Sequence, residues 1–513
     1  MKLMLIFMLS IFIGFSQSQP NKPFFTSLNK LCNMILYTKT CYDTLSPLID
    51  TKITYDSEFF YNLSLQVSTD EILKASKKFN SENGILARKI KHSHDKLTLS
   101  ALQSCRVLLS LALYNLDLSL PTSALTTHEN RTDFITWLSA LIADLQMCKD
   151  RFEYAPNEIQ KLVIESLDNS TKLVTISLGI ISKIDDFMSA RGKRSIVDKV
   201  DKRWGPDWLS FKDKKQILNS NQMVTPNVVV AVDGSGNYTT INEAINAVPP
   251  NSDQSFVIYV KKGVYNENVN IDMTKWNICL YSTATFAVHG TRFLAKDIGF
   301  RNTAGLSSGQ ALALLSTSDQ SVFYRCLFDS YQDTLCTQSN RQFYRECKIY
   351  GTVDFIFGEA AVVIQNSEIL VKKPLPGQPN IITAQGKSGP NYNSGISIQN
   401  CSIMAAEDLS GVQTFLGRPW NVYSTVVVME SQLGSLIDPK GWLPFANNAT
   451  APDTVFYVEY NNVGPGATTT NRVTWKGLRV NNTQYDASKF TVRSFIGGDK
   501  WLPATGVPFQ ADL

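Results

Sequence analysis

Histidine is scarce in this sequence: its 513 residues include four, at His92, His94, His128 and His289. Only His289 lies in the C-terminal half. A metal site built from several histidines is therefore excluded there, and a Ser-His-Asp triad would depend on His289 alone. Catalytic chemistry in that half must come from other side chains.

An excess of charge of one sign is also missing. The 49 basic and 45 acidic residues leave a net charge of +4, which argues against an electrostatic nucleic-acid binder. With 43% hydrophobic and 18% charged residues, the chain has a globular composition. Its length predicts two or more domains.

Long apolar runs are rare too. The main one, Leu3–Phe15, follows Met1-Lys2 and precedes a small, polar stretch, Ser16–Pro20. It is short for a membrane-spanning helix, which needs about 20 apolar residues, and it predicts a cleaved signal peptide over residues 1–19. A signal anchor is the alternative. We judge no other window apolar enough to span a bilayer, so the mature protein is expected to be secreted, with no integral membrane segment.

Export permits disulfides and glycosylation. The nine cysteines form an N-terminal set of four and a C-terminal set of five: Cys32, Cys41, Cys105 and Cys148, then Cys279, Cys326, Cys336, Cys347 and Cys401. Six Asn-x-Ser/Thr sequons are glycosylation candidates, and Asn400 begins an Asn-Cys-Ser sequence: Asn62, Asn130, Asn169, Asn237, Asn448 and Asn481.

Residues 24–190 have the apolar spacing of amphipathic helices and predict an all-α four-helix bundle. Apolar residues recur every three or four positions from Leu102 to Leu116, from Phe134 to Cys148 and from Leu173 to Phe187. Cys105 and Cys148 lie on the apolar faces of two such helices, so either a bridge between neighbouring helices or two buried thiols is possible.

Residues 191–226 show no sustained period and predict a linker. It contains Arg191-Gly192-Lys193-Arg194 and the charged run Lys212–Lys215. A basic cluster between two domains of an exported protein is a candidate site for a processing protease, although such clusters are more often simply solvated.

Residues 227–513 change to short β-rich runs with an internal repeat. Phe323-Tyr324-Arg325-Cys326 returns as Phe343–Cys347, and Ile364–Ser367 returns as Ile398–Cys401. Short strands repeated at about 20 residues without intervening helices predict an all-β parallel β-helix. An antiparallel β-sandwich is the runner-up, but it would need more hairpin turn signals.

This repeat has a chemical consequence. Asp333 and Asp354 are 21 residues apart, so adjacent coils would hold them about 4.8 Å apart. Two carboxyls this close cannot both ionise freely, and the pair can divide into a nucleophile and a general acid. Gln310 and Gln332, 22 apart, would offer two amide donors on the same side. The alternative is that all four are ordinary turn and ladder residues.

Four segments closely resemble the signature motifs of plant pectin methylesterases. In chain order they are Tyr331–Leu335 (YQDTL), Gly351–Gly358 (GTVDFIFG), Ile382–Gly386 (ITAQG) and Leu416–Trp420 (LGRPW). The resemblance extends from about Val228 to Leu513 and implies a right-handed parallel β-helix. The N-terminal half resembles the pectin methylesterase inhibitor domain, in which the first cysteine pairs with the second and the third with the fourth.

The resemblance implies a role for each matching residue. Asp354 corresponds to the nucleophile that attacks the methyl ester of galacturonate, and Asp333 to the proton donor that later acts as a base. Gln332 corresponds to the group that stabilises the charged intermediate, and Gln310 to a substrate contact. Arg418 corresponds to a substrate-binding arginine and Trp420 to a sugar contact, for which core packing is the alternative. This chemistry requires no metal and no organic cofactor.

Three features depart from the family pattern. About one coil is missing between Leu280 and Tyr281, and Leu280 stands where the family has a substrate-contacting threonine. Ser367 replaces the partner of Cys347, which leaves Cys347 free or able to pair with Cys326. The dibasic processing signals of the family are altered at Arg191–Arg194 and Lys214–Leu218, so the usual signals for release of the N-terminal domain are not present in their family form.

Three functions therefore compete. The first is a secreted cell-wall pectinesterase made as a precursor, which acts on pectin and carries an autoinhibitory or chaperoning N-terminal domain that could also act in trans. The second is a catalytically impaired paralogue that works mainly as an inhibitor or binding protein because of the missing coil. The third, a pectin lyase or polygalacturonase, ranks low because those enzymes would need calcium or a larger aspartate cluster.

Overall fold

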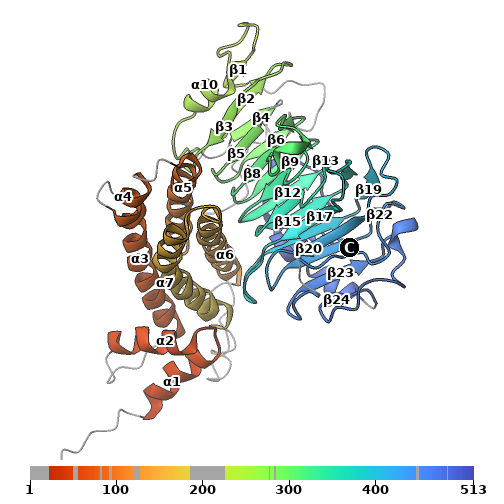
Figure 1. Ribbon diagram of the computed structural model, residues 1–513. Helices are drawn as coiled ribbons and strands as arrows, with labels where there is room; N and C mark the ends of the chain where they lie inside the picture. Colours follow the sequence, from red (N-terminus) through yellow and green to blue (C-terminus); the bar gives the residue numbers. More distant parts are fainter. Residues whose placement is uncertain are drawn as a thin grey trace, which may run out of the picture.

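The computed structural model describes residues 22–49, 56–80, 84–91, 95–120, 128–184, 226–252, 254–275, 278–281, 285–445, 450–481 and 483–513. The chain forms an N-terminal helical domain and a C-terminal β domain, which lie next to each other in space (Figure 1). The predicted two-domain architecture is confirmed. The proposed signal peptide and nearly all of the proposed linker lie outside the described residues.

The helical domain is built around four long helices. These are α3 (Ser57–Asn80), α5 (Lys96–Leu118), α6 (His128–Asp150) and α7 (Asn157–Ser182), joined by the shorter α1 (Lys22–Asn33), α2 (Thr38–Leu45), η1 (Ser46–Leu48) and α4 (Ile85–Lys91). The apolar faces read from the sequence meet in one core, with Leu109, Leu138 and Leu141 fully buried. The predicted four-helix bundle is confirmed.

Two disulfides fasten the bundle. Cys32–Cys41 joins α1 to α2, and Cys105–Cys148 joins α5 to α6. The second bridge decides between the two possibilities that the sequence left open for Cys105 and Cys148.

One stretch of α5, Thr98–Leu118, has the length and hydropathy of a membrane-spanning helix, so the expectation that no window after residue 19 is apolar enough is wrong. Half of this stretch is buried inside the bundle, where α5 packs against α3 and α6. Bundle packing therefore accounts for its apolar face.

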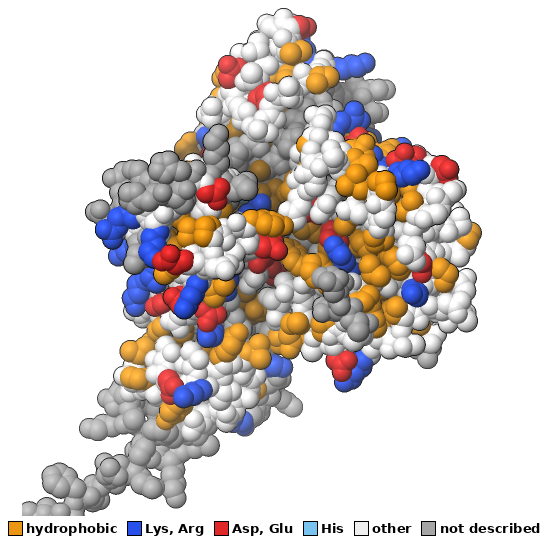
Figure 2. Space-filling model, in the orientation of Figure 1, with side chains coloured by type: hydrophobic (Ala, Val, Ile, Leu, Met, Phe, Trp, Pro, Cys, Tyr) orange, Lys and Arg blue, Asp and Glu red, His pale blue; other side chains and the backbone are white. Residues whose placement is uncertain are grey.

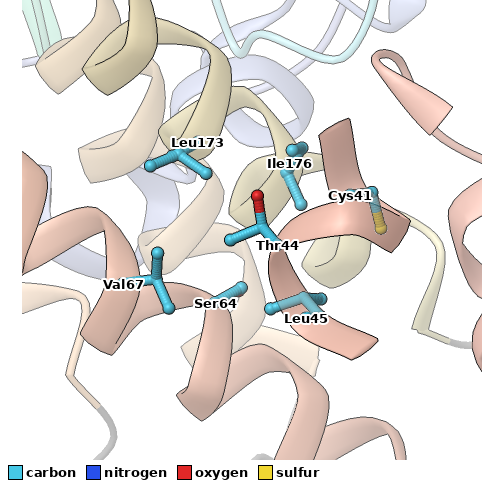
Figure 3. A pocket seen from close by; sticks show the side chains of 7 residues that line it. All are labelled: Cys41, Thr44, Leu45, Ser64, Val67, Leu173 and Ile176. Carbon is cyan, nitrogen blue, oxygen red and sulfur yellow. The ribbon is translucent and has the colours of Figure 1, made fainter. Parts of the chain in front are cut away.

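A small hollow lies inside the bundle between α2, α3 and α7 (Figure 3). Its walls are mainly aliphatic: Cys41, Thr44, Leu45, Ser64, Val67, Leu173 and Ile176. No charged side chain lines it, and Cys41 is bonded to Cys32, so we assign the hollow to helix packing.

The β domain consists of three parallel sheets wound around one core. The first sheet contains, in spatial order, β1 (Val228–Val230), β2 (Phe256–Val260), β4 (Ile278–Tyr281), β6 (Leu294–Lys296), β9 (Ser321–Tyr324), β12 (Arg341–Arg345), β15 (Ala361–Gln365), β18 (Gly395–Gln399), β21 (Thr425–Met429), β23 (Phe456–Tyr460) and β24 (Leu478–Arg479).

The other two sheets complete the coils. The second holds β3 (Asn268–Ile271), β5 (Thr285–Val288), β8 (Leu314–Ser316), β11 (Leu335–Thr337), β14 (Ile356–Gly358), β17 (Asn380–Gln385) and β20 (Thr414–Pro419). The third holds β7 (Gly299–Arg301), β10 (Leu327–Asp329), β13 (Lys348–Gly351), β16 (Glu368–Val371), β19 (Ser402–Ala405) and β22 (Gln432–Leu433). Every strand pair among the described residues is parallel, so the parallel β-helix is confirmed and the β-sandwich is wrong.

Side chains of successive coils stack inside the β-helix. Phe323 lies over Tyr344 with ring centroids 4.7 Å apart, and Phe300 lies over Phe328 at 5.3 Å. Short elements cover the outside: α10 (Ile241–Asn246) near β1 and β3, and α11 (Gln484–Ser488), α12 (Val492–Ile496) and α13 (Gly498–Trp501) over the first sheet. Three 3-10 turns are η3 (Leu306–Ser308), η4 (Pro465–Ala467) and η5 (Leu502–Thr505).

The coil that leaves Leu280 is short. Along the first sheet, Ile258 pairs with Leu280, 22 residues later, whereas Leu280 pairs with Ala295 after only 15. The next pair, Ala295 and Phe323, is separated by 28. The stack is nevertheless continuous across this point, because β4 pairs on both sides. The departure expected near Leu280 therefore coincides with the shortest coil in this sheet.

Candidate active site

Asp333 and Asp354 occupy equivalent positions on adjacent coils. Each precedes by two residues a strand of the second sheet, and the first residues of those strands, Leu335 and Ile356, are direct partners. Both aspartates have a positive φ, 61° and 51°, a strained conformation for a non-glycine residue that is common at functional sites. The structure therefore brings the predicted pair together.

Burial disfavours the charged form of both aspartates, and the charge of Asp354 adds to this effect at Asp333. Burial, and then the charge of Asp354, raises the pKa of Asp333 to about 8. Burial also raises the pKa of Asp354, and Arg418 opposes that shift. Both pKa values are raised, but only Asp354 has a hydrogen-bonded cation that opposes the effect of burial, which favours Asp354 over Asp333 as the ionised carboxylate.

That partner is Arg418, on β20. Its Nε donates to Asp354 Oδ1 at 2.9 Å and its Nη2 to Asp354 Oδ2 at 2.5 Å. This bidentate pair fixes the plane of the carboxylate. The guanidinium also lies 4.8 Å from the ring centre of Phe445.

The two predicted amides lie on neighbouring coils as well. Gln310 and Gln332 form an isolated parallel bridge, and Ala311 N donates to Gln332 O at 3.1 Å. Gln310 is exposed and Gln332 half-buried, so both are accessible to a ligand over the aspartates.

Trp420 flanks the same site. It is half-buried, and its ring meets Phe357 edge-on with centroids 6.1 Å apart. A Cβ on Gly386 would come within 2.8 Å of the indole, so a glycine is needed there. Trp420 thus packs against Phe357 and Gly386 while the residue as a whole stays partly exposed.

A lysine that sequence reasoning missed supports the loop before Asp333. Lys372 Nζ binds Asp329 Oδ1 at 3.0 Å and the Ser330 carbonyl at 3.1 Å, and it lies 3.7 Å from the ring centre of Tyr331. These are three consecutive residues ahead of Gln332. Asp329 also pairs with Arg301. Lys372 therefore holds in place the segment that carries Gln332 and Asp333.

The helical bundle packs onto this face of the β-helix. Side chains of the second sheet, Cys336, Leu315 and Phe357, join the apolar cluster of the bundle. Arg151, just after α6, is close enough to Asp333 to lower its pKa, against the larger effect of burial. Figure 1 shows α6 on the side of the bundle that faces the sheets.

Hydrogen bonds and ion pairs cross this contact. From α6, Trp137 Nε1 donates to Asp319 Oδ2 at 3.1 Å, and Ser139 Oγ accepts from Asn393 N at 3.0 Å. The Arg341 guanidinium lies between Asp319 and Asp133 at 2.7 and 2.5 Å. Arg341 and Asp319 are almost fully buried, so this charged cluster is shielded from solvent.

Two further carboxyls are buried at the contact. Asp144 on α6 accepts from Asn115 and, across the domains, from Ser339, yet burial raises its pKa well above the usual value. Burial also raises the pKa of Glu359 well above normal, and its Oε2 has no hydrogen-bond partner. Glu359 lies near Lys149 and Asp150, so α6 places one basic and one acidic side chain close to it.

The charged side chains are otherwise dispersed. On the face shown in Figure 2, acidic and basic groups are interspersed and form no continuous basic surface. Of the glycosylation candidates, Asn62, Asn169, Asn237 and Asn481 are exposed, as is Asn400. Asn448 and the side chain of Asn130 lie outside the described part of the chain.

Comparison with known families gives two matches. Residues 26–180 match the model described as plant invertase/pectin methylesterase inhibitor. The pectinesterase model matches residues 227–283 and 279–499, two segments that meet at the short coil near Leu280.

Individual relatives agree. The chain is 41% identical to a probable pectinesterase/pectinesterase inhibitor 46 of Arabidopsis thaliana, over 96% of this chain and 89% of the relative. It is 40% identical to pectinesterase 3 of Phaseolus vulgaris, over 95% and 87%. The solved structure of pectin methylesterase from carrot matches with a TM-score of 0.55 and 47% identity, over 57% of this chain and 99% of the carrot protein.

Proposed function

The chain belongs to the pectinesterase family, as a carboxylic ester hydrolase preceded by an inhibitor-type domain, and from this premise we propose that it hydrolyses pectin methyl esters with Asp354 as nucleophile. The observation that supports this assignment most directly is the Asp333–Asp354 pair on adjacent coils. Within this pair, Arg418 forms a bidentate ion pair with Asp354 and not with Asp333.

The first half-reaction forms an acyl-enzyme. A carboxylate oxygen of Asp354 attacks the ester carbonyl carbon of a galacturonate unit, and the carbonyl oxygen takes the negative charge. Amide donors of Gln332, with Gln310 on the next coil, stabilise that oxyanion. As the carbonyl re-forms, the C–O bond to the methoxy group breaks, and Asp333 gives that oxygen its proton, so methanol leaves.

The second half-reaction releases the enzyme. Asp333, now a carboxylate, removes a proton from water, which attacks the acyl carbon of the anhydride formed with Asp354. The Asp354 carboxylate leaves, galacturonate is the product, and Asp333 is protonated again. A pKa of about 8 suits this alternation, because Asp333 starts protonated at neutral pH.

Substrate binding falls to the flanking side chains. Trp420 offers an indole face to the apolar side of a pyranose, with Phe357 supporting it from behind. Arg418 keeps the Asp354 carboxylate oriented and, with its remaining donor, suits a neighbouring sugar carboxylate.

The bundle is proposed to restrain the enzyme. It packs against the sheet that carries both aspartates, and its contacts involve Ser339, Arg341 and Asn393, on coils next to the site. A polymer cannot occupy the space taken by α6, so the uncleaved chain is expected to be less active. Cleavage in the linker 191–226 by a processing protease would end this restraint.

Secretion to the cell wall completes the proposal. The two disulfides of the bundle indicate folding in an oxidising compartment, and at least four sequon asparagines are accessible to glycosylation. Both properties are expected of a chain that enters the secretory pathway through a signal at residues 1–19.

Methanol release from methyl-esterified pectin tests the activity. We expect release by the secreted chain after cleavage in the linker, and its loss in Asp354→Ala. Asp453→Ala, an exposed aspartate paired with Lys476, is the matched control and should remain active. Full activity in Asp354→Ala would refute the mechanism.

A second candidate is an impaired enzyme that acts mainly as an inhibitor. The short coil after Leu280, where the family match breaks, favours it. It predicts no methanol release even after linker cleavage, together with inhibition of other plant pectinesterases by the intact chain. The two outcomes separate the candidates.

A further inference from the structure

A column of small polar side chains runs along the β-helix at the turn after the first sheet. Its members, one per coil, are Cys326, Cys347, Ser367, Cys401 and Ser431. Each follows a residue with φ between 52° and 54°: Arg325, Glu346, Asn366, Asn400 and Glu430. The turn is therefore nearly identical in all five coils.

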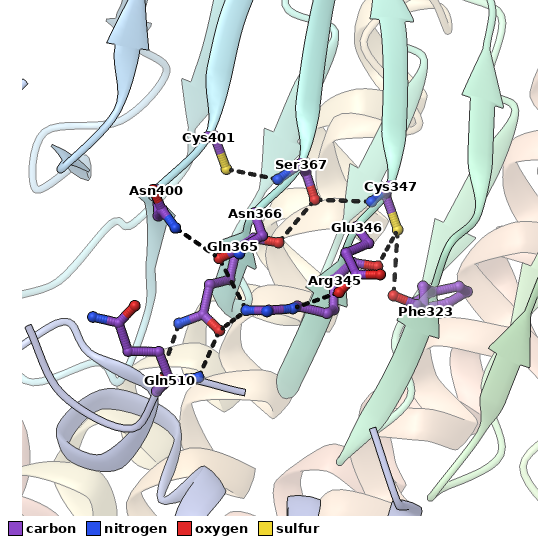
Figure 4. A network of polar contacts seen from close by, with 10 residues as sticks. All are labelled: Phe323, Arg345, Glu346, Cys347, Gln365, Asn366, Ser367, Asn400, Cys401 and Gln510. Atoms are coloured by element: carbon purple, nitrogen blue, oxygen red, sulfur yellow. Dashed lines mark hydrogen bonds and ion pairs between the residues drawn. The ribbon is translucent and has the colours of Figure 1, made fainter. Parts of the chain in front are cut away.

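Hydrogen bonds link successive members (Figure 4). Cys347 N donates to Ser367 Oγ at 3.0 Å, Ser367 N to Cys401 Sγ at 3.4 Å, and Cys401 N to Ser431 Oγ at 3.0 Å. The side chains of Ser367, Cys401 and Ser431 thus each accept a bond from the backbone of the preceding coil. Cys326 and Cys347 are the one place among these five positions where two sulfurs are neighbours.

The distance fits a covalent bond. The flanking residues of this pair are in register, Tyr324 with Arg345 and Leu327 with Lys348, so their spacing is one coil, about 4.8 Å. Disulfides span Cα separations of about 4.4–6.8 Å, whereas Cys401 is two coils from Cys347, roughly 10 Å away. The two thiols are also in contact: burial and a hydrogen bond with Cys347 raise the pKa of the Cys326 thiol.

We propose that Cys326 and Cys347 form a third disulfide when the chain folds in the compartment that oxidises the bundle cysteines. One thiolate attacks a disulfide oxidant, such as oxidised glutathione or a dithiol oxidoreductase, and releases one thiol from it. The second thiolate then attacks the mixed disulfide and releases the other, so two protein thiols are oxidised and one disulfide is reduced. Both cysteines are buried in the finished fold, so this exchange occurs before the coil closes.

The bridge would enclose the catalytic coil. The segment from Cys326 to Cys347, a sequence separation of 21, includes β10, the Gln332-Asp333 loop, β11 and β12. Closing this loop restricts the unfolded chain and ties the coil of Asp333 to the next one. Serine already occupies two positions of the column, so Cys326→Ser is expected to fold.

Peptide mapping tests the bridge directly. The secreted full chain is alkylated without reduction and digested with trypsin, which cuts after Arg325, Arg341, Arg345 and Lys348. We expect peptide 326–341 linked to peptide 346–348, two hydrogens lighter than the separate thiols. A further cut after Tyr331 separates Cys326 from Cys336, and the link should stay with Cys326.

Variants complete the test. Cys326→Ser should expose Cys347 to alkylation after denaturation and lower the melting temperature of the β domain, a difference that disappears when both proteins are reduced. Cys401→Ser, in the same column but without a sulfur neighbour, should leave the linked peptide unchanged. Alkylated Cys326 and Cys347 in the wild type, or a link from Cys347 to any other cysteine, would overturn the proposal.

Discussion

Asp333 keeps its proton at pH values where an exposed aspartate is ionised, because burial and Asp354 raise its pKa to about 8. The unfolded chain releases this proton near pH 4. Between these values the folded state binds more protons than the unfolded state, so the contribution of Asp333 to stability becomes less favourable as pH rises.

Asp333→Asn therefore should stabilise the β domain while abolishing turnover. We expect its melting temperature to equal that of the wild type near pH 4 and to exceed it by several degrees at pH 8. Thermal melts from pH 4 to pH 8 measure this difference. Asp453→Asn is the control, since this exposed side chain should give no pH-dependent difference. A melting temperature for Asp333→Asn that is lower at pH 8 would contradict the argument.

Lys372 gives a prediction about positioning. Lys372→Met removes the ion pair with Asp329, the bond to Ser330 and the contact with Tyr331. The loop of Gln332 and Asp333 then loosens, so we expect kcat to fall about tenfold with KM little changed, equivalent to about 1.4 kcal/mol.

Steady-state methanol release checks this split between kcat and KM. Lys372→Arg should recover much of kcat, because arginine can keep both the charge and the carbonyl contact. Lys348→Met removes an exposed ion pair with Glu368 in the same sheet and serves as the control. A rise in KM alone would assign Lys372 to substrate binding instead.

The pairing of Asp333 with Asp354 was predictable because its spacing equals one coil, whereas the contacts around the pair could not be predicted from spacing. The 21-residue offset places Asp333 beside Asp354, and the structure has that register. Arg418 was expected through the family resemblance alone, and its bond to Asp354 spans 64 residues; Lys372, which was not expected, reaches Asp329 over 43. Between Ile364 and Ile398 the coil lengthens to 34 residues, so a fixed period cannot align residues beyond it.

At the scale of elements, the β pattern of the sequence does not show where one strand ends and the next begins. The continuous β-rich stretch 341–351, for example, forms two strands, β12 and β13, separated near Glu346 with φ 54°. This residue has no glycine-like signal in the sequence, since its left-handed conformation is imposed by the stack. The bend at each such position is what turns a continuous β pattern into a coil.

Gly358 is an element-scale case where glycine is required. It ends β14 with φ 128°, and a Cβ there would lie 2.0 Å from the Thr337 carbonyl oxygen on the neighbouring coil. We expect Gly358→Ala to destabilise the β domain by roughly 3 kcal/mol or more, since both strain and a backbone clash oppose it.

Chemical denaturation measures that loss. Gly377→Ala is the matched control: its φ is 84°, but nothing lies within 4 Å of the added Cβ. We expect it to cost only the conformational strain, about 1 kcal/mol. Equal losses in the two variants would show that the contact with Thr337 has no energetic effect.

At the scale of the whole molecule, the contact between the domains is what neither half of the sequence predicts alone. The amphipathic pattern of α6 explains its buried face within the bundle, yet Thr136 and Ser139 contact Asn393, more than 250 residues away. Such polar contacts have no periodic signature. The family resemblance implied an inhibitor-type domain, and in the structure α6 of that domain packs against the β-helix.

Ser139→Arg tests whether this contact restrains the enzyme, as proposed above. Ser139 is 4% exposed and its hydroxyl accepts from Asn393 N, so an arginine cannot fit without separating α6 from the β-helix. We expect methanol release by the uncleaved chain to rise on the order of tenfold. Glu158→Arg, at an exposed position paired with Lys89 on α4, should leave the rate unchanged. Unchanged activity in Ser139→Arg would show that the bundle does not restrain the enzyme.

The strength of the contact should also depend on pH. Docking buries Asp144 and Glu359, and burial raises the pKa of both carboxyls well above normal. When the domains separate, water lowers these pKa values again, so the docked state binds more protons. Raising the pH above about 4 therefore favours separation, and the uncleaved chain is expected to gain activity relative to the cleaved enzyme between pH 5 and pH 8.

Asp144→Asn tests this argument. The variant removes one of the two titrating carboxyls, while an amide at this position can still bond Ser339 and Asn115. The ratio of uncleaved to cleaved activity should accordingly rise less steeply with pH in this variant.

An identical pH dependence of this ratio in the variant and the wild type would mean that Asp144 is already ionised in the docked state. Its complete burial, without a cationic partner among the described side chains, argues against that.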